Sequence, residues 1–312
     1  MSTTTITKKR NVRKRAVCVG IDEFAFVNGL SGCVNDCLDM AETLKGIGFP
    51  RTHIKILTNE NATKADIMKA IAWLTADAMP GDVLVYYHSG HGTQIADLSG
   101  DEEDRIDEAI VCHDFDWTEI DGQISGCITD DELYNVFTGK VQKGVLTDVV
   151  LDTCFSGSGT RSIFRLSDLE KDPKSKAYRK QRYLPPPPEH MFIINDTNPS
   201  TADIHYFSKN ILEGENKKSK DIVEQNNVLW AAAQDFQESW EVYFSATDTV
   251  RGAFTYFFCV SIRAQKGTAT RGDLYRGVKA ELYNSGFDQI PALEVPTPEA
   301  ENLRPFKKLS EQ

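Results

Sequence analysis

The sequence predicts an α/β fold in which a mostly parallel central sheet is covered by helices on both faces. Short, continuously apolar runs alternate along the first half of the chain with segments whose apolar residues recur at helical spacing. Strands that are apolar throughout, rather than at every second residue, are typical of parallel sheets buried on both faces. The length of 312 residues and the 40% hydrophobic content fit one large soluble domain or two small ones.

The elements of the first half follow from these two periodicities. A helix over 62–79 is expected to end before Pro80 and Gly81. Thr129 is suited to cap the N-terminus of another helix, because its hydroxyl can accept a backbone N–H bond. Strands are expected over 15–21, 53–58, 82–89 and 147–153, and helices over 31–49, 62–79 and 129–137.

The chain changes character after residue 160. Eight basic residues lie from Arg161 to Arg182 and four prolines follow, so this stretch is predicted to be a loop rather than the interior of an element. Loose, polar composition continues to about residue 226. Order resumes with a strand at 227–234, helices at 252–265 and 270–286, and an edge strand at 288–294, where Pro291 is tolerated.

These boundaries divide the chain into a basic tail and one domain in two parts. The tail covers 1–14, the first part 15–163, a linker 164–226 and the second part 227–312. The basic cluster from Lys8 to Arg15 is interpreted as a solvated tail.

Charge and cysteine content narrow the class of protein. A net charge of −11 argues against general binding to nucleic acid, and no apolar run is long enough to span a membrane. The N-terminus lacks the apolar core of a secretory signal, so we expect a cytoplasmic protein. The seven cysteines are odd in number and form no Cys-x-x-Cys pair, which disfavours disulfides and zinc. We expect most of them to be buried thiols and at least one to be a nucleophile.

Two reactive residues follow predicted strands, each close to glycines. His91 lies between Gly90 and Gly92 after the run 82–89, and Cys154 follows the run 147–153. Ligands of parallel sheets bind at the carboxyl ends of the strands, so we expect the imidazole and the thiol to lie together there. Such a histidine can accept the thiol proton, and the N–H groups of Gly92 and Cys154 can bind an oxyanion. Either residue alone is more often structural, but the pair indicates a catalytic site.

Five stretches around these residues resemble the caspase-like cysteine peptidases, and within them the metacaspases and their bacterial relatives, the orthocaspases. They are LSGCVNDC (30–37), YYHSGHGTQ (86–94), GDEEDRIDEAI (100–110), ITDDEL (128–133) and LDTCFSGSG (151–159). The resemblance is strong over residues 15 to 160 and weaker over 227 to 294. It implies a single caspase-like domain with large- and small-subunit parts, and hydrolysis of peptide bonds in protein substrates by a His91–Cys154 dyad.

The residues before the nucleophile indicate a basic substrate. Caspases that cut after aspartate carry Gln-Ala-Cys, whereas this chain has Asp152-Thr153-Cys154. The resemblance to metacaspases implies that four residues line the pocket for the residue before the cut: Cys33, Asp36, Ser89 and Asp152. Two carboxylates there would bind Arg or Lys and repel a carboxylate. Without the family, Asp36 would be interpreted as a charge on a helix surface and Asp152 as a turn residue.

An acidic segment admits two interpretations. Residues 101–116 contain eight carboxylates and one basic side chain, which fits either a solvated loop or a calcium site. By resemblance to calcium-dependent metacaspases, the ligands would be Asp107, Asp130 and Asp131. Arg161 lies near the place where that family carries a further acid, and a second cation there opposes calcium.

The basic stretch of the linker is expected to be cut as an activation step. It is loop-like, it is rich in the residues that an acidic pocket selects, and caspase-like enzymes are divided into two parts at this place. The candidate sites are Arg161, Arg165, Lys171, Lys174, Lys176, Arg179, Lys180 and Arg182. Either the chain itself or a separate activating protease could make the cut. A catalytically silent binding module and a peptidase of different specificity are the alternative functions.

Overall fold

A six-stranded sheet forms the centre of the computed structural model, which describes residues 11–96, 106–120, 123–155, 178–188, 190, 227–234, 237–308 and 311–312. The strand order is β12-β9-β7-β3-β1-β2, and every neighbouring pair is parallel except β12 with β9. The strands are β1 (Lys14–Gly20), β2 (Ile54–Thr58), β3 (Val83–Ser89), β7 (Leu146–Asp152), β9 (Asn227–Ala231) and β12 (Ala292–Glu294). The predicted sheet is therefore confirmed, with an edge strand inside 288–294.

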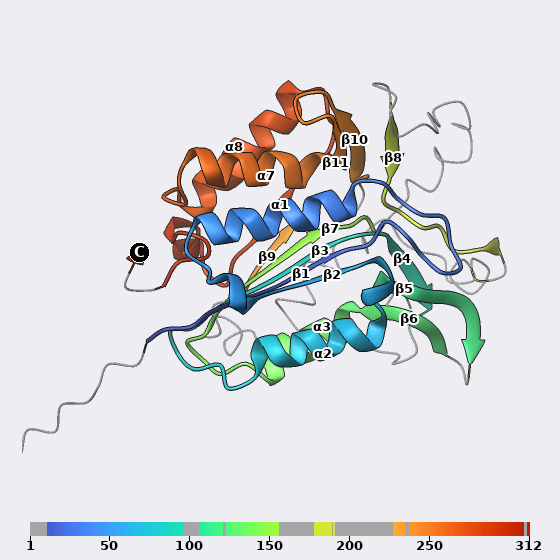
Figure 1. Ribbon diagram of the computed structural model, residues 1–312, viewed down its shortest axis with the longest axis horizontal. Coiled ribbons are helices and arrows are strands. Elements are labelled where there is room, and N and C mark those ends of the chain that lie inside the picture. Colours follow the sequence, from blue (N-terminus) through green and yellow to red (C-terminus); the bar gives the residue numbers. More distant parts are fainter. Residues whose placement is uncertain are drawn as a thin grey trace, which may run out of the picture.

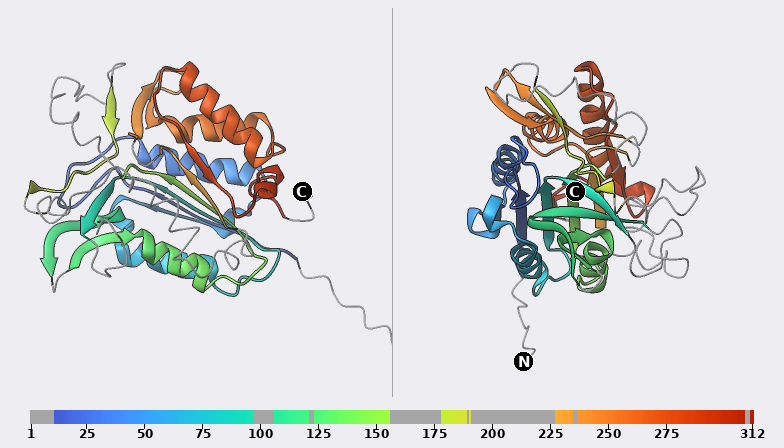
Figure 2. Two further views of the ribbon diagram at one scale, coloured as in Figure 1. Left: turned by 180° about the vertical axis from the view of Figure 1, so that it is seen from behind. Right: turned by 90° about the vertical axis from the view of Figure 1, so that its right-hand side faces the viewer.

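Helices cover both faces of this sheet (Figure 1), and the two views of Figure 2 show the same layers. On β1, Ala16 and Cys18 pack among residues of α1, α7 and α8, whereas Val17 and Val19 pack among residues of α2 and α3. Both faces of the strand are thus buried, which explains its uninterrupted apolar sequence. The helices are α1 (Cys33–Gly46), α2 (Lys64–Thr75), α3 (Asp130–Gly139), α7 (Ala253–Ala264) and α8 (Arg271–Asn284), with short 3₁₀ turns at Arg51–His53, Asn59–Asn61 and Pro298–Asn302.

The acidic segment lies largely in a strand of a second, antiparallel sheet, so its interpretation as a solvated loop is wrong from Ile106 onward. This sheet joins β4 (Gly92–Ala96), β5 (Ile106–Ile120) and β6 (Gln123–Thr129). Ile110 and Cys112 of β5 pack into the core beneath the central sheet, and Val111 and Phe115 pack into a separate apolar cluster. Burial of both faces of β5 in this way stabilises the strand despite the surrounding carboxylates.

The linker also contains a strand, which corrects the prediction of a continuous loop. β8 (Arg179–Gln181) pairs antiparallel with β10 (Trp240–Phe244), and β10 pairs with β11 (Thr249–Gly252). β8 has no apolar residue, so its own sequence gave no strand signal. Its pairing partner lies about sixty residues further along the chain, and the order comes from that partner.

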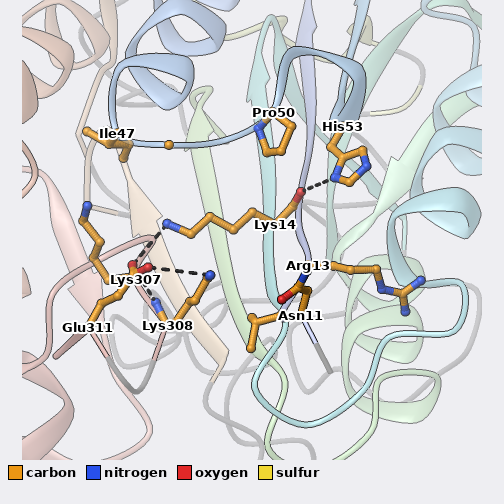
Figure 3. Close-up of a pocket in the computed structure, with 11 residues that line it drawn as sticks. Asn11, Arg13, Lys14, Ile47, Pro50, His53, Lys307, Lys308 and Glu311 are labelled. Atoms are coloured by element: carbon orange, nitrogen blue, oxygen red, sulfur yellow. Dashed lines mark hydrogen bonds and ion pairs between the residues drawn. The ribbon is translucent and has the colours of Figure 1, made fainter. Parts of the chain in front are cut away.

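The solvated tail predicted for Lys8 to Arg15 does not include Lys14. Lys14 begins β1, is buried, and its Nζ lies 3.3 Å from a carboxylate oxygen of Glu311 and 3.3 Å from the carbonyl oxygen of Phe306. Figure 3 shows this side chain extended toward Glu311 across a pocket at the end of the sheet where β1 begins. The C-terminal residues therefore bind the first strand.

All seven cysteines are buried and free, as expected for a chain without disulfides. Within the residues that the structure describes, no helix has the length and apolar character needed to cross a bilayer.

Candidate active site

Adjacent strands β3 and β7 bring His91 and Cys154 to the same edge of the sheet. The strands are parallel, and Ser89 at the end of β3 pairs with Asp152 at the end of β7. Each reactive residue follows two positions later. A Cβ atom on Gly92 would lie 2.4 Å from the carbonyl oxygen of Cys154, so the backbone beside His91 packs directly against the Cys154 backbone. Only glycine allows this approach, which explains the glycine after the histidine.

The imidazole of His91 is oriented by a backbone group. The residue is 3% exposed, and its Nε2 lies 3.0 Å from the carbonyl oxygen of Asn28. Because a carbonyl oxygen only accepts, Nε2 carries the proton and Nδ1 of the neutral ring carries the lone pair. Burial lowers the pKa of His91 to about 4, against smaller raising effects of the backbone at Asn28 and Arg182. The ring is therefore neutral at pH 7 and can accept a proton at Nδ1.

The thiol of Cys154 is covered by the second part of the chain. Cys154 is 2% exposed, and its Sγ donates to the carbonyl oxygen of Gln237 over 3.4 Å. The Gln237 side chain is itself fixed, because Nε2 donates to the carbonyl oxygen of Asp288 and Oε1 accepts from the N–H of Ile290. The first part of the domain, which carries Cys154, thus contacts the second part, which carries Gln237, at the sulfur atom.

The predicted acidic pocket is occupied by an arginine of the chain itself. The guanidinium of Arg182 is fully buried. Its Nη2 lies 2.6 Å from Oδ2 of Asp36, and its Nη1 lies 2.9 Å from both Oδ1 of Asp152 and Oγ of Ser89. A third carboxylate, Glu241, lies 3.9 Å from Nη2. A buried guanidinium needs such charge-assisted partners, and the two nitrogens of its fork each contact a different acid.

Neutral donors fix the two acids that contact Arg182. Asp36 accepts the N–H of Gly252 at 2.9 Å, and Asp152 accepts from Thr255 Oγ1 at 2.6 Å and Ser239 Oγ at 2.8 Å. Burial raises the pKa of Asp36 to about 7, even though Arg182 opposes this shift. Removing the guanidinium would therefore raise the pKa of Asp36 further, because its largest opposing charge would be gone.

The backbone of Arg182 is bound in extended form across the end of the sheet. Its N–H donates to the carbonyl oxygen of Ser239 over 3.1 Å, and its carbonyl oxygen accepts the N–H of Gly92 over 3.0 Å. On the following side, the N–H of Leu184 donates to the carbonyl oxygen of Gly92 over 2.9 Å. The chain is therefore held by hydrogen bonds on both sides of the Arg182–Tyr183 peptide bond. The carbonyl oxygen of that bond accepts the backbone N–H of Gly92, the residue after His91.

Comparison with known proteins identifies the family of this chain. The caspase domain family model matches residues 13–302. This chain belongs to the caspase domain family. It is 28% identical over 303 residues to Metacaspase-1A of Aspergillus oryzae, and this alignment covers 91% of this chain and 68% of that relative. It is also 28% identical over 304 residues to Metacaspase-1 of Emericella nidulans, with 93% of this chain and 72% of that relative covered. The predicted resemblance is confirmed, and membership in this peptidase family makes the chain a cysteine peptidase.

Two solved structures share the caspase fold of this chain. Protein GSU0716 from Geobacter sulfurreducens aligns with a TM-score of 0.65 and 22% identity over 95% of this chain and 99% of its own. Caspase-1 from Spodoptera frugiperda aligns with a TM-score of 0.54 and 14% identity over 96% and 92%. At these identities the likeness describes the fold alone.

The caspase-domain structure also contains site residues that sequence reasoning missed. Asn28 acts through its backbone carbonyl, so its side chain gave no signal. Ser239 reaches the acidic pocket from the segment before β10, Glu241 from β10 and Thr255 from α7, and nothing in their local sequence indicates this. The sequence indicates Arg182 only as a cleavage candidate. Cys33, the remaining predicted pocket residue, is buried, and this raises the pKa of its thiol well above the ordinary value despite the Arg182 charge.

The predicted calcium ligands of this caspase-family chain lie on two segments that meet at one corner of the second sheet. Asp107 lies on β5, Asp130 and Asp131 begin α3, and the pairing of Ala109 with Thr129 brings these segments together. Asp107 and Asp130 are buried. Arg161 and the cleavage candidates Arg165, Lys171, Lys174 and Lys176 lie outside the described residues, whereas Arg179, Lys180 and Arg182 lie within them.

Proposed function

We propose that the chain is a cysteine endopeptidase that cuts peptide bonds after arginine or lysine with a His91–Cys154 dyad. The strongest support for this proposal is that Arg182 of the chain itself fills the acidic pocket. The guanidinium of Arg182 lies between Asp36 and Asp152 while its carbonyl oxygen accepts the N–H of Gly92. A pocket that binds an arginine side chain and its carbonyl in this way is suited to a substrate arginine. Because a fork reaches both carboxylates at once, arginine substrates should be cut faster than lysine substrates.

The reaction follows from the groups at the site. The sulfur of Cys154 attacks the carbonyl carbon after the bound arginine, and Nδ1 of His91 takes the thiol proton. The N–H groups of Gly92 and Cys154 stabilise the negative charge on the carbonyl oxygen. The C–N bond then breaks, His91 gives the proton to the leaving amine, and a thioester remains. Water, deprotonated by His91, hydrolyses the thioester and restores the thiol.

The same contacts support activation by a cut within the linker, and they favour one of the eight candidate sites. The Arg182–Tyr183 bond lies in the same molecule as the dyad, and the carbonyl oxygen of Arg182 accepts the N–H of Gly92, the proposed oxyanion donor. We therefore propose that the activating cut falls at this bond and that the chain makes this cut in itself. Arg179 and Lys180 do not occupy the acidic pocket, because their side chains contact Phe287 and the carbonyl oxygen of Gly29 respectively.

Calcium remains part of the proposal at the Asp107, Asp130 and Asp131 corner. Carboxylate oxygens are the ligands that calcium prefers, and two of these three acids, Asp107 and Asp130, are buried. These residues would hold the ion between β5 and the start of α3, where it would brace the sheet that carries Gly92. None of the catalytic groups named above is a ligand of the ion.

Purified protein tests the function directly. Peptides with Arg, Lys, Asp or Leu before a reporter are incubated with the wild-type chain, Cys154→Ala and His91→Ala. We expect cleavage after Arg and Lys only, none with Cys154→Ala, and a rate lowered by about 10²–10⁴ with His91→Ala, since a general base contributes about that factor. Cleavage after Asp as fast as after Arg would refute the acidic specificity, and wild-type activity in Cys154→Ala would refute the dyad.

Mass spectrometry of the same samples tests the self-cleavage. The wild-type chain should yield a fragment that begins at Tyr183, at a rate that does not depend on protein concentration. Cys154→Ala should stay whole, even when mixed with active enzyme, because its own cleft already buries the bond. A cut whose rate rises with concentration would show cleavage by a second molecule instead, and Cys154→Ala that is cut at Arg182 when active enzyme is added would show the same.

A further inference from the structure

A second subsite lies upstream of the arginine pocket, beside the other end of β8. A cavity of about 360 Å³ opens there between β8, β10, α7 and the end of α8. Its wall is mostly aromatic and is formed by Tyr243, Phe244, Tyr256, Phe257 and Phe287. Among the described residues that line it, none is acidic, so it differs in chemistry from the pocket around Arg182.

The aromatic rings of this wall form one continuous surface. Phe244 and Tyr256 stack with ring centroids 3.9 Å apart, and Phe257 packs edge-on against Phe244 at 5.9 Å and against Phe287 at 6.5 Å. Phe287 is buried as well, so its ring has a fixed place in the wall. A fixed ring face carries partial negative charge and attracts a cation placed over it.

Arg179 provides that cation. Its guanidinium carbon lies 5.4 Å from the centroid of the Phe287 ring, although the residue as a whole is exposed. Arg179 is the first residue of β8, and Arg182 follows three positions later. The pairing of Val242 with Arg179 and of Trp240 with Gln181 fixes the spacing between the two arginine sites on the enzyme. Residues 179–184, here called the internal segment, thus present two cations at a fixed separation: Arg179 faces the aromatic wall and Arg182 fills the acidic pocket.

We propose that Phe287 selects a basic side chain at the fourth residue before the cut, so that the enzyme recognises the sequence basic-x-x-Arg. This inference rests on the proposed peptidase function and adds a second specificity determinant to it. A substrate that replaces the internal segment would pair with β10 in the same register. Its fourth residue before the cut would then lie over the Phe287 ring. An acidic residue would be repelled by the ring face, and alanine would not reach it.

Four peptides test this inference. They share the sequence x-Lys-Gln-Arg-Tyr-Leu, taken from the internal segment, with x as Arg, Ala, Leu or Glu. Cleavage is measured with wild-type protein whose self-cleavage is complete. We expect kcat/KM for the Arg peptide to exceed that for the Ala peptide by about two- to fivefold, the effect of one cation–π contact at an exposed site. The Glu peptide should be the slowest.

Two variants assign the effect to one ring. In Phe287→Leu the ratio of Arg to Ala peptides should fall to about 1, because leucine keeps the apolar contact and removes the π system. In Tyr283→Leu, which changes an aromatic residue on α8 that is 80% exposed, the ratio should stay at the wild-type value. The ratio is taken within one preparation, so any loss of folded Phe287→Leu protein cancels.

The outcomes separate this inference from the proposed function. Equal cleavage of all four peptides, or an unchanged ratio in Phe287→Leu, would overturn the role of Phe287 and leave cleavage after arginine intact. A Leu peptide that is cut faster than the Arg peptide would show an apolar subsite and overturn the cation–π assignment. Failure to cut any peptide would overturn the peptidase function and this inference with it.

Discussion

Asp36 and Asp152 share the binding of one guanidinium, and each carboxylate is held by separate donors. This division means that neither acid can replace the other. We expect Asp36→Asn or Asp152→Asn to lower kcat/KM for arginine peptides by about 2–5 kcal/mol, or about thirtyfold to several thousandfold, as when one partner of a buried charge pair is removed. Asp39→Asn is the matched control, because Asp39 lies one turn along α1 and pairs with Arg251 and Arg263 instead. An equal loss in the control would show a general effect on α1.

The raised pKa of Asp36 makes arginine binding depend on pH. The carboxyl must be ionised to hold the guanidinium, and its pKa lies at about 7 with Arg182 in place. The free pocket lacks the Arg182 charge, so the pKa of Asp36 is higher still there, and we expect kcat/KM for arginine peptides to rise as the pH increases from 7 upward. His91 does not explain this rise, because its pKa of about 4 lies below the range. Asp36→Asn should remove the rise, and a variant that keeps it would assign the titration to another group.

At the scale of elements, β8 is a three-residue strand whose position depends on the Arg182 side chain and on its pairing with β10. We expect Arg182→Gln to release this strand, because glutamine cannot satisfy two carboxylates. The uncut variant should cleave peptides from the first moment, whereas the wild-type chain should show a lag while it cuts itself. Progress curves with parallel gels measure this. Arg165→Gln should keep both the lag and the cut, and a lag in Arg182→Gln would contradict the blocking role of β8.

Calcium should act on the junction of β5 and α3. If Asp107, Asp130 and Asp131 bind the ion, millimolar calcium should raise the melting temperature by preferential binding to the folded state, and a chelator should reverse the rise. Asp107→Asn should abolish the effect. Asp116→Asn on the same strand should retain it, because Asp116 accepts bonds from Thr118 instead. The same melting temperature with calcium and with chelator would exclude the site.

At the scale of the whole molecule, buried histidines couple stability to pH. His88 on β3 is fully buried, and burial lowers its pKa to about 3. The folded-state pKa lies below the unfolded value of about 6.5, so its contribution to stability is complete above pH 6.5 and is lost as the pH falls toward 3. At pH 5 the loss from His88 is about 2 kcal/mol.

Urea unfolding at pH 5, 6 and 7 measures this contribution. His88→Asn should flatten the pH dependence of the unfolding free energy by about 1 kcal/mol per pH unit below pH 6. Tyr86→Phe removes only the hydroxyl that lies 3.3 Å from Nδ1 of His88, so it should lower stability and keep the wild-type slope. Equal slopes in wild type and His88→Asn would refute the assignment.

The sequence predicted the part of the molecule that local patterns encode. Apolar runs placed β3 and β7, and parallel pairing then brought His91 and Cys154 together. The family resemblance supplied Asp36 and Ser89. Strands β5 and β8 were missed because their composition is polar and their partners are distant. The occupation of the acidic pocket by Arg182 was missed for a related reason: its partners Asp152, Ser89 and Asp36 lie 30, 93 and 146 positions away, and no local pattern records such contacts.

A single cut after β8 does not release the residues that fill the acidic pocket. A break between Arg182 and Tyr183 leaves the four residues before it connected to Cys154 through the preceding chain, 155–178. A competitor on such a tether stays at an effective concentration on the order of millimolar, however dilute the enzyme is. The cut chain would therefore act like an enzyme mixed with its own reversible inhibitor. Weak substrates would be excluded, strong ones would displace the arginine, and a second cut further upstream would free the site by letting the short peptide diffuse away.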